Sequence, residues 1–349
     1  MRMRGLGLAL LVGAMMPGTS WAQATPVPDV LKSYGKDGTF DPGDFGWMAG
    51  RFAAEGAAAR AAWQSVAAYK EACIAAATGK AKAELAMIGA ESTNLPPGPY
   101  GDEACRAITA AMAIDAGSEA ERAALPARLA EARQLWNFAL AGGRMGIGAV
   151  TSAVGPPESE DAQMLIGATF REQLGRHMLS WGVDEGDPPL PARLKPLFDY
   201  LGWTMIAGED RKNREKLRAY MAEKGWPTIS ALGEKASHAA WLLAQHADDD
   251  PALQVRALRL MEPLAKAGEA SKSNYAYLYD RVMLKLAGRQ RYATQFGGCE
   301  AGRAIRPLRP MEDDDPAHID AARAEMGLEP LAVYRKEMDE AFGACAAAE

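Results

Sequence analysis

The chain has 349 residues, of which 48% are hydrophobic but only 7% are aromatic, and its formal net charge is −6. This acidic balance argues against a nucleic-acid-binding protein, which would carry a basic patch, and the chain lacks the basic amphipathic helix typical of membrane-surface binding. The composition is rich in alanine and poor in β-branched residues, which favours helices throughout.

Residues 1–22 have the pattern of a secretory signal peptide. Two arginines precede an apolar run over 5–16, and a small-x-small cleavage site ends at Ala22. The run is too short to cross a bilayer, and no later segment is long and apolar enough to do so. The sequence therefore predicts a periplasmic or secreted protein that begins at Gln23 and has no integral membrane segment.

The chain contains four cysteines, and all of them lie after the predicted cleavage site: Cys73, Cys105, Cys299 and Cys345. An even number of cysteines in an exported protein predicts disulfide bonds. Three pairings of four cysteines exist, and we favour Cys73–Cys105 and Cys299–Cys345 because each pair lies within one predicted domain.

The predicted fold is all-α, with two helical domains after the signal peptide. We place the boundary in the acidic, proline-rich segment 184–191, so that the N-terminal domain covers 23–190 and the C-terminal domain 191–349. Hydrophobic spacing and capping residues predict helices at about 44–78, 80–90, from Ser118, from Ser159, and at 191–207, 210–223, 230–247, 250–267, 272–287, 316–326 and 330–342. The stretch 288–315 is predicted to be irregular.

Two features interrupt this helical pattern in the N-terminal half. Pro126 lies inside the helix that begins at Ser118 and is expected to kink or split it. The glycine-rich run 142–148 is interpreted as a flexible turn, because a phosphate-binding loop would need a preceding strand and a Gly-Lys-Ser/Thr ending.

His177 falls in an apolar row and is expected to be a hydrogen-bonded core histidine.

His246 is the first candidate for chemistry, because it extends the buried stripe of the helix at 230–247 while His238, Trp241 and Gln245 lie on the opposite side. Three aspartates follow it at 248–250. A carboxylate beside it would suit a general base or a metal ligand. The alternative is a structural histidine near a helix C-terminus, where its charged form is favoured.

Asp280 is the second candidate, because it lies between Tyr277 and Leu284 on an apolar face of the helix at 272–287. A carboxylate in such surroundings must be paired or must line a cavity. Since Arg281 is adjacent and points elsewhere, we expect the two side chains to reach His246, Arg323, Gln295 or a ligand. The alternative is a buried ion pair that holds helices in register.

The same residues carry a resemblance to a family of bacterial proteins known only as a domain of unknown function. The shared motifs, in order, are Asp210-x-x-Asn213, Gly225-Trp226-Pro227, Gly233-Glu234-Lys235-Ala236, Gln245-His246-Ala247-Asp248, Tyr277-Leu278-x-Asp280-Arg281, Thr294-Gln295-Phe296, Asp320-x-x-Arg323 and Gly327-Leu328. The match covers about 210–334. It implies a helical domain and no particular activity. Ala293 stands where many relatives have glycine, so the loop around it is expected to differ in shape.

The leading hypothesis is an acid–base enzyme, hydrolase-like, that acts on a small polar or peptidic substrate. His246 is the base, Asp280 orients it or is the second acid–base group, and the substrate-binding residues are Arg281, Gln295, Gln245, Trp226, Tyr277 and Arg323. The alternative is a non-catalytic helical binding module for a peptide, glycan or partner protein, with a groove lined by Trp226, Trp241 and tyrosines. A metal site formed by His246 and carboxylates is a third hypothesis. No motif names a cofactor, and no dedicated metal motif is present.

Overall fold

The structure is a computed structural model of the chain, and it describes residues 26–32, 35–36, 39–40, 47, 56–114, 124–154, 159–181, 189–297, 306–307 and 311–342. The predicted signal peptide and the predicted Cys299–Cys345 disulfide lie outside these residues. The all-α prediction is confirmed. In the described part of the chain, no helix is sufficiently long and apolar to cross a membrane.

The N-terminal half contains a short hairpin and long helices. Its elements are α1 (Asp29–Lys32), β1 (Gly35–Lys36), β2 (Thr39–Phe40), α3 (Gly56–Met87), α4 (Glu103–Met112), α6 (Leu125–Val154) and α7 (Glu160–Leu179). Strands β1 and β2 pair antiparallel. The loop predicted between α3 and α4 is present, and Thr78 fastens it by accepting a hydrogen bond from the Gly98 backbone N–H at 3.0 Å.

The C-terminal half begins with a turn of 3-10 helix, and short turns join the helices from α8 to α11. Its elements are η1 (Ala192–Leu194), α8 (Lys195–Lys224), α9 (Ile229–Gln245), α10 (Pro251–Ala267), α11 (Lys272–Ala287), β3 (Phe296–Gly297), β4 (Arg306–Pro307), α12 (Pro316–Glu325) and α13 (Leu331–Phe342). Strands β3 and β4 form a second small antiparallel pair.

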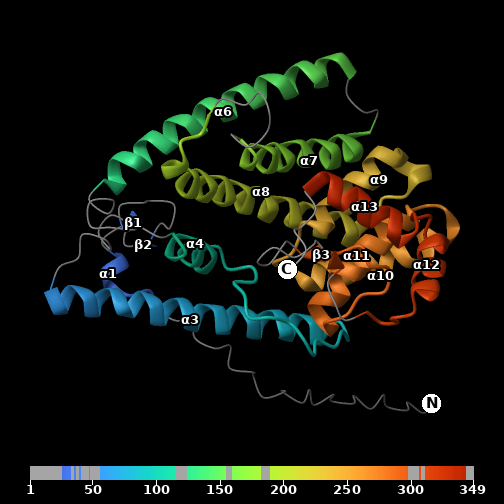
Figure 1. Cartoon of the computed structure of the whole chain (residues 1–349), viewed down its shortest axis with the longest axis horizontal. Helices are drawn as coiled ribbons and strands as arrows, with labels where there is room; N and C mark the ends of the chain where they lie inside the picture. Colours follow the sequence, from blue (N-terminus) through green and yellow to red (C-terminus); the bar gives the residue numbers. More distant parts are fainter. Residues whose placement is uncertain are drawn as a thin grey trace, which may run out of the picture.

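Three long helices, α6, α7 and α8, pack against one another and form one layer (Figure 1). Helix α4 lies between this layer and α3, and α9 packs on both α7 and α8. One hydrophobic cluster joins α3, α7, α8, α9, α10 and α11, so it includes residues on both sides of position 190. The division into two domains at that position stays a prediction.

Glycines allow the close approach of the three helices. A Cβ atom at Gly143 would collide with Leu174, and one at Gly175 would lie 2.8 Å from Ile206 Cγ1. Gly143 belongs to the run 142–148, which was predicted from the sequence to be a flexible turn. That interpretation is wrong, because the run continues helix α6 to Val154. Packing against α7 outweighs the low helix propensity of glycine.

Three other expectations about helices are corrected in the same way. One helix, α3, covers Gly79, where two were predicted, and one helix, α8, covers Gly208, where two were predicted. Pro126 lies in the first turn of α6, where the missing N–H has no intrahelical partner to lose, so it starts the helix and does not kink it. His177 is exposed and is therefore not a core histidine.

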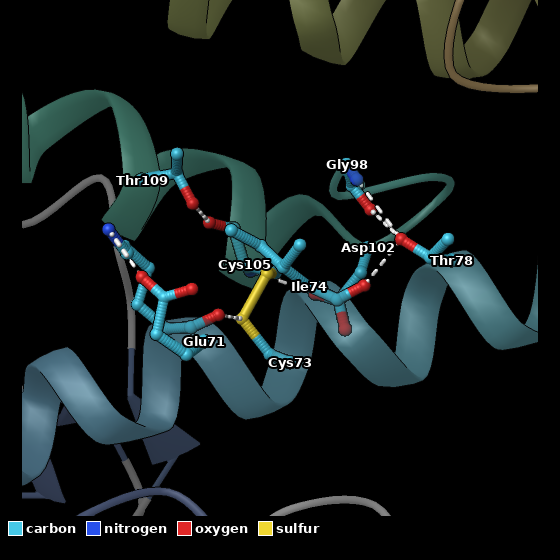
Figure 2. The surroundings of a disulfide bond; sticks show 9 residues. Glu71, Cys73, Ile74, Thr78, Gly98, Asp102, Cys105 and Thr109 are labelled. Atoms are coloured by element: carbon cyan, nitrogen blue, oxygen red, sulfur yellow. Dashed lines mark hydrogen bonds and ion pairs between the residues drawn. A yellow bond between two sulfur atoms is a disulfide. The ribbon is translucent and has the colours of Figure 1, made fainter. Parts of the chain in front are cut away.

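The predicted disulfide between Cys73 and Cys105 is present and joins α3 to α4 (Figure 2). Asp102 caps α4 by accepting a hydrogen bond from the Cys105 backbone N–H at 2.8 Å. The start of α4 is thus fixed both by a covalent bond and by a cap. This matters for function because α4 forms one wall of the cavity described next.

Candidate functional site

The turn between α9 and α10 carries His246 and the three aspartates. Helix α9 ends at Gln245, and His246 is its C-cap, with its backbone N–H bonded to Leu242 O. Asp250 caps α10 by accepting from the Leu253 backbone N–H at 3.0 Å. Pro251 occupies the first turn of α10, as predicted. Both ends of the turn are therefore fixed, and so are the directions in which its side chains point.

His246 pairs with a carboxylate, but that carboxylate comes from a distant helix. Its Nδ1 lies 2.9 Å from Glu172 Oε2 of α7, and Glu172 is completely buried. The His246 side chain remains 19% exposed. Hydrogen bonding of Nδ1 to a carboxylate favours the proton on Nδ1, which leaves Nε2 as the free ring nitrogen. Within the described part of the chain, no hydrogen bond to Nε2 is present.

Glu172 is held in turn by Arg176, one turn along α7. Arg176 forms an ion pair with Glu172 and also reaches Asp210 of α8, with Nη2 to Oδ2 at 3.0 Å. Burial raises the pKa of Asp210, while Arg176 opposes that shift. His246, Glu172, Arg176 and Asp210 thus form one connected polar row from α9 through α7 to α8.

Asp248 faces a different set of partners, which come from α10 and α11. Arg281 Nε donates to its Oδ1 at 2.8 Å, and Lys285 Nζ lies 2.9 Å from the same oxygen. Lys285 also donates to the Asp248 carbonyl and to Gln254. Burial alone would raise the pKa of Asp248, but the charges of Lys285 and Arg281 outweigh it and hold that pKa far below its usual range.

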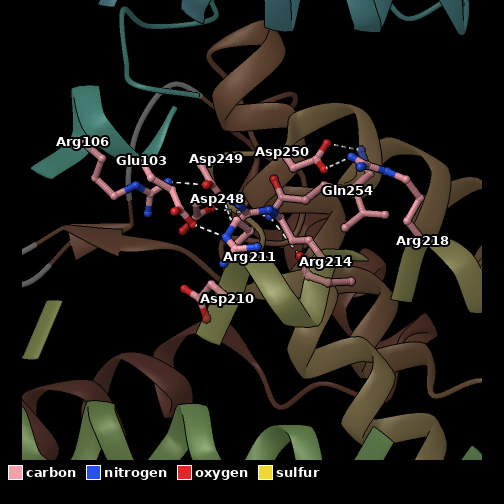
Figure 3. Close-up of polar contacts among 12 residues, drawn as sticks. Glu103, Arg106, Asp210, Arg211, Arg214, Arg218, Asp248, Asp249, Asp250 and Gln254 are labelled. Carbon is pink, nitrogen blue, oxygen red and sulfur yellow. Dashed lines mark hydrogen bonds and ion pairs between the residues drawn. The ribbon is translucent and has the colours of Figure 1, made fainter. Parts of the chain in front are cut away.

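Arginines of α8 hold the other two aspartates of the turn (Figure 3). Asp249 lies between Arg214, whose Nη1 is 2.5 Å from Oδ1, and Arg106 of α4. Asp250 pairs with Arg218. A further ion pair joins Arg211 of α8 to Glu103 of α4. Ion pairs therefore hold the turn to three helices: α4, α8 and, through Asp248, α11.

These groups surround a cavity of about 510 Å³ between α4, α7, α8 and the turn after α9. Its charged lining residues are Glu103, Arg106, Arg176, Asp210, His246, Asp248 and Asp249. Its apolar wall comes from α4 and α8 and includes Ala110, Ile206 and Trp203, the last of which is 54% exposed. We call this space the cavity below.

Asp280 lies in a separate cluster and has no exposed surface. Its two oxygens accept hydrogen bonds from the backbone N–H groups of Arg291, Tyr292 and Thr294, at 2.8 to 3.2 Å, and from the Thr294 hydroxyl at 2.9 Å. Burial raises the pKa of Asp280, and these hydrogen bonds oppose the shift. Its carboxylate is satisfied by a loop of its own chain.

Arg323 binds the same loop from the other side. Its Nη1 donates to the carbonyl of Tyr292 at 2.6 Å and its Nε donates to the carbonyl of Glu329 at 2.6 Å. The loop 291–294 is thus held by its N–H groups through Asp280 and by a carbonyl through Arg323. We call these two side chains and the loop the loop clamp. Ala293 in this loop has φ of 50°, the only positive φ of a non-glycine residue in the described ranges.

Of the partners considered for Arg281, Gln295 is the one it contacts, with Nη1 of Arg281 donating to Oε1 of Gln295 at 3.3 Å. Both therefore connect the loop clamp to Asp248, which lines the cavity. Among the described contacts, none joins His246 to Asp280, Arg281 or Gln295. The structure divides the predicted site into an open part at His246 and a closed part at Asp280.

The remaining predicted binding residues lie away from the cavity surface. Trp226 is buried in the core, Gln245 is 7% exposed, and neither lines the cavity. Tyr277 packs edge-on between Trp241 and Tyr334, with ring centroids 6.4 and 6.2 Å away. The predicted groove of tryptophans and tyrosines thus lacks the Trp226 side chain.

The sequence interpretation missed three residues that line the cavity, Arg176, Arg106 and Trp203, and also Glu172, which is buried beside His246. Glu172 and Arg176 have an i, i+4 spacing that is usual for a surface ion pair on a helix, so the pattern gave no sign of burial. One signal was available for Glu172, since it lies on the same helical face as Leu165 and Ala168. Asp210 did belong to a quoted motif, although no role was assigned to it.

The third hypothesis, a metal site at His246, would need several ligand side chains close together in the described part of the chain. Among the described residues, no group of three or more histidine, cysteine, aspartate or glutamate side chains could hold a metal ion. His246 has one carboxylate neighbour, and Arg176 already neutralises that carboxylate.

Comparison with known proteins supports the resemblance noted in the sequence. Residues 199–346 match the model of a family of unknown function, DUF6624. No match was found among the curated proteins or among the solved structures. The matched segment contains His246, Asp210 and the whole loop clamp, whereas Glu172, Arg176 and Arg106 precede it. The cavity therefore combines side chains from inside and outside the family segment.

Proposed function

We propose that the protein is an acid–base enzyme that hydrolyses a small polar or peptidic substrate bound in the cavity, with His246 as the general base. The observation that carries the proposal is the 2.9 Å contact between His246 Nδ1 and the buried Glu172 at the edge of a space of about 510 Å³. A buried carboxylate that orients a histidine is a recurring arrangement in acid–base catalysis.

In this mechanism water is the nucleophile. Nε2 of His246 takes a proton from water while the oxygen forms a bond to the carbonyl carbon of the substrate. The bond to the leaving group then breaks, and the imidazolium returns the proton to that group. Glu172 stabilises the imidazolium, and the ion pair with Arg176 holds Glu172 in place. Asp280 has no acid–base role here, because the loop takes up both of its oxygens.

The test is turnover of a panel of fluorogenic esters, amides and short peptides by the wild type, His246→Gln and Glu172→Gln. We expect kcat/KM to fall by about 10²–10⁴-fold in His246→Gln and less in Glu172→Gln. His177→Gln is the matched control, because His177 is an exposed histidine on the same helix as Glu172. Wild-type turnover in a folded His246→Gln variant would overturn the proposal.

A second candidate function is a non-catalytic binding module for a small ligand or peptide. The observation in its favour is that charged side chains around the cavity are already paired, as Asp249 is with Arg106 and Arg214. A ligand that raises the melting temperature while no member of the panel is turned over would favour binding over catalysis.

We also propose that the protein is exported to the periplasm or secreted. The signal-peptide pattern over 1–22 and the Cys73–Cys105 disulfide support this location. Mass spectrometry of the protein purified from a Gram-negative host should find Gln23 at the N-terminus, and an intact Met1 would contradict export by this route.

A further inference from the structure

The two helices that form the long walls of the cavity carry matching gradients of polarity. On α8, the lining residues Trp203, Ile206, Ala207 and Asp210 follow an i, i+3, i+4, i+7 stripe that ends in a charge. On α4, the stripe Glu103, Arg106, Ala107 and Ala110 has the same spacing but begins with its charges.

The ion pair between Arg211 and Glu103 sets the register of these two helices. The end of the α8 stripe near Asp210 therefore lies beside the start of the α4 stripe. Both helices place their charges at that end, where His246 and Arg176 also lie. The opposite end is apolar, with Trp203 from α8 and Ala110 from α4. Seven residues of helix span roughly 10 Å, which gives the length of this gradient.

The charged end has spare hydrogen-bond donors and few spare acceptors. Both oxygens of Asp210 are bound by Arg176, and Asp249 gives one oxygen to Arg214 and the other to Arg106. A guanidinium has five N–H donors, and the described contacts of Arg106 and Arg176 use only some of them. A ligand that offers acceptor oxygens, such as a carboxylate, suits this end better than an amine.

We propose that the cavity binds an amphipathic organic acid, which is the product, and the ester or amide of that acid, which is the substrate. The oxygen-bearing head lies at Arg106 and Arg176, and the apolar or aromatic tail lies against Trp203. This inference rests on the proposed function for its site and names the substrate class. An exposed tryptophan at the apolar end provides a large contact surface for such a tail.

The test is calorimetric titration of the purified protein with 4-phenylbutyrate, 4-phenylbutylamine and acetate. We expect 4-phenylbutyrate to bind and the other two to bind at least about tenfold more weakly, because one lacks the anionic head and the other lacks the tail. Binding of the amine as tight as that of the acid, or no binding of the acid at millimolar concentration, would overturn the inference.

Variants locate the site. Trp203→Ala and Arg106→Gln should each weaken 4-phenylbutyrate binding by about tenfold. The matched controls are Phe138→Ala, an aromatic on α6 that is 69% exposed, and Arg171→Gln, an exposed arginine of α7 paired with Glu209. Equal effects of the controls would place the ligand elsewhere and overturn the inference.

The binding test and the catalytic test fail separately. His246→Gln should abolish most turnover while it weakens 4-phenylbutyrate binding less than Arg106→Gln does, because the described contacts of His246 include neither Arg106 nor Arg176. Binding of the acid without any turnover would retain the inference and remove the proposed hydrolysis. Turnover of substrates without an apolar tail would retain the proposed hydrolysis and remove the inference about the substrate class.

Discussion

The cavity and the loop clamp are built from the same kinds of residues but use them differently. In the loop clamp, Asp280 and Arg323 are buried, and their charged groups form hydrogen bonds with backbone groups of loop 291–294. At the cavity, His246 has a buried partner on one ring nitrogen, and its side chain is 19% exposed. A buried polar residue thus indicates function only where part of it still faces open space.

The difference also separates two consequences of mutation. A residue of the loop clamp should affect mainly stability, because removing it leaves backbone groups unpaired in the interior. A residue of the cavity should affect mainly binding or turnover. The following predictions test this division, beginning with the largest expected effect.

Asp280→Ala should lower the free energy of unfolding by about 3–5 kcal/mol, because three backbone N–H groups and the Thr294 hydroxyl lose their acceptor. Urea denaturation measures the change. His246→Ala should cost only about 1 kcal/mol, since Glu172 keeps Arg176. Asp161→Ala, which removes a surface ion pair with Lys224, is the control and should cost less than about 1 kcal/mol. A larger loss in His246→Ala than in Asp280→Ala would contradict the division.

Removal of the disulfide should destabilise α4, which forms one wall of the cavity, although neither cysteine lines the cavity. The bond joins residues 32 positions apart, and a closed loop of this size predicts a loss of about 3–4 kcal/mol in Cys73→Ala/Cys105→Ala. Thermal and urea unfolding under oxidising conditions measure the loss. Because α4 is tied to α3 by this bond, ligand affinity should fall as well. Unchanged affinity in the folded variant would show that the charges at Glu103 and Arg106 suffice to hold α4.

Asp248 connects the two regions and should make stability sensitive to acid. Lys285 and Arg281 hold the pKa of Asp248 below its unfolded value, so its contribution is complete above about pH 4 and is lost as pH falls below that. Wild-type stability should therefore fall more steeply between pH 5 and pH 2.5 than that of Asp248→Asn. The difference should be well below the single-proton limit of about 1.4 kcal/mol per pH unit, because the Asp248 side chain is 47% exposed and solvent screens its ion pairs. Equal slopes would mean that Asp248 contributes no proton linkage. Asp314→Asn serves as a surface control.

Ala293→Gly should give the smallest effect and the opposite sign. The backbone at Ala293 has φ of 50°, which costs an L-residue about 1–2 kcal/mol, while glycine adds an unfolded-state entropy cost of about 0.5–1 kcal/mol. We expect a gain in stability of up to about 1 kcal/mol by urea denaturation. Ala270→Gly is the control, since Ala270 is also buried in a turn but has no positive φ, and it should lose stability. A loss in both variants would show that Ala293 is not strained.

The fold class, the Cys73–Cys105 disulfide and most helix boundaries in the C-terminal half follow from local rules. The cap at Asp250 and the bounds of α11 are examples, because capping and hydrophobic spacing act within a few residues. The cap at Ser159, in the N-terminal half, is another. Gly79, Gly143 and Gly208 misled the prediction. Each has a low intrinsic helix propensity. At Gly143 the helix continues because it packs closely on Leu174, a contact that sequence spacing does not contain. Among the described residues, no such close neighbour lies at Gly79 or Gly208, and the long helices run through both positions.

For the candidate site, helical geometry identified His246 and Asp280 as polar residues on buried faces but could not tell which carboxylate meets which base. Glu172 is 74 positions from His246, and such pairing depends on how α7 packs on α9. For Arg281 the sequence left several partners open, and the one that the structure brings to it, Gln295, lies in the loop that follows its own helix. The sequence could place nearby residues among the candidates, whereas contacts between distant helices could not be predicted.

The close packing of α6 on α7 limits how this part of the chain can vary. Because Leu174 occupies the space that a side chain at Gly143 would need, a larger residue at position 143 requires a shorter one at position 174. In proteins descended from the same ancestor, these two positions should change together, although they lie on different helices.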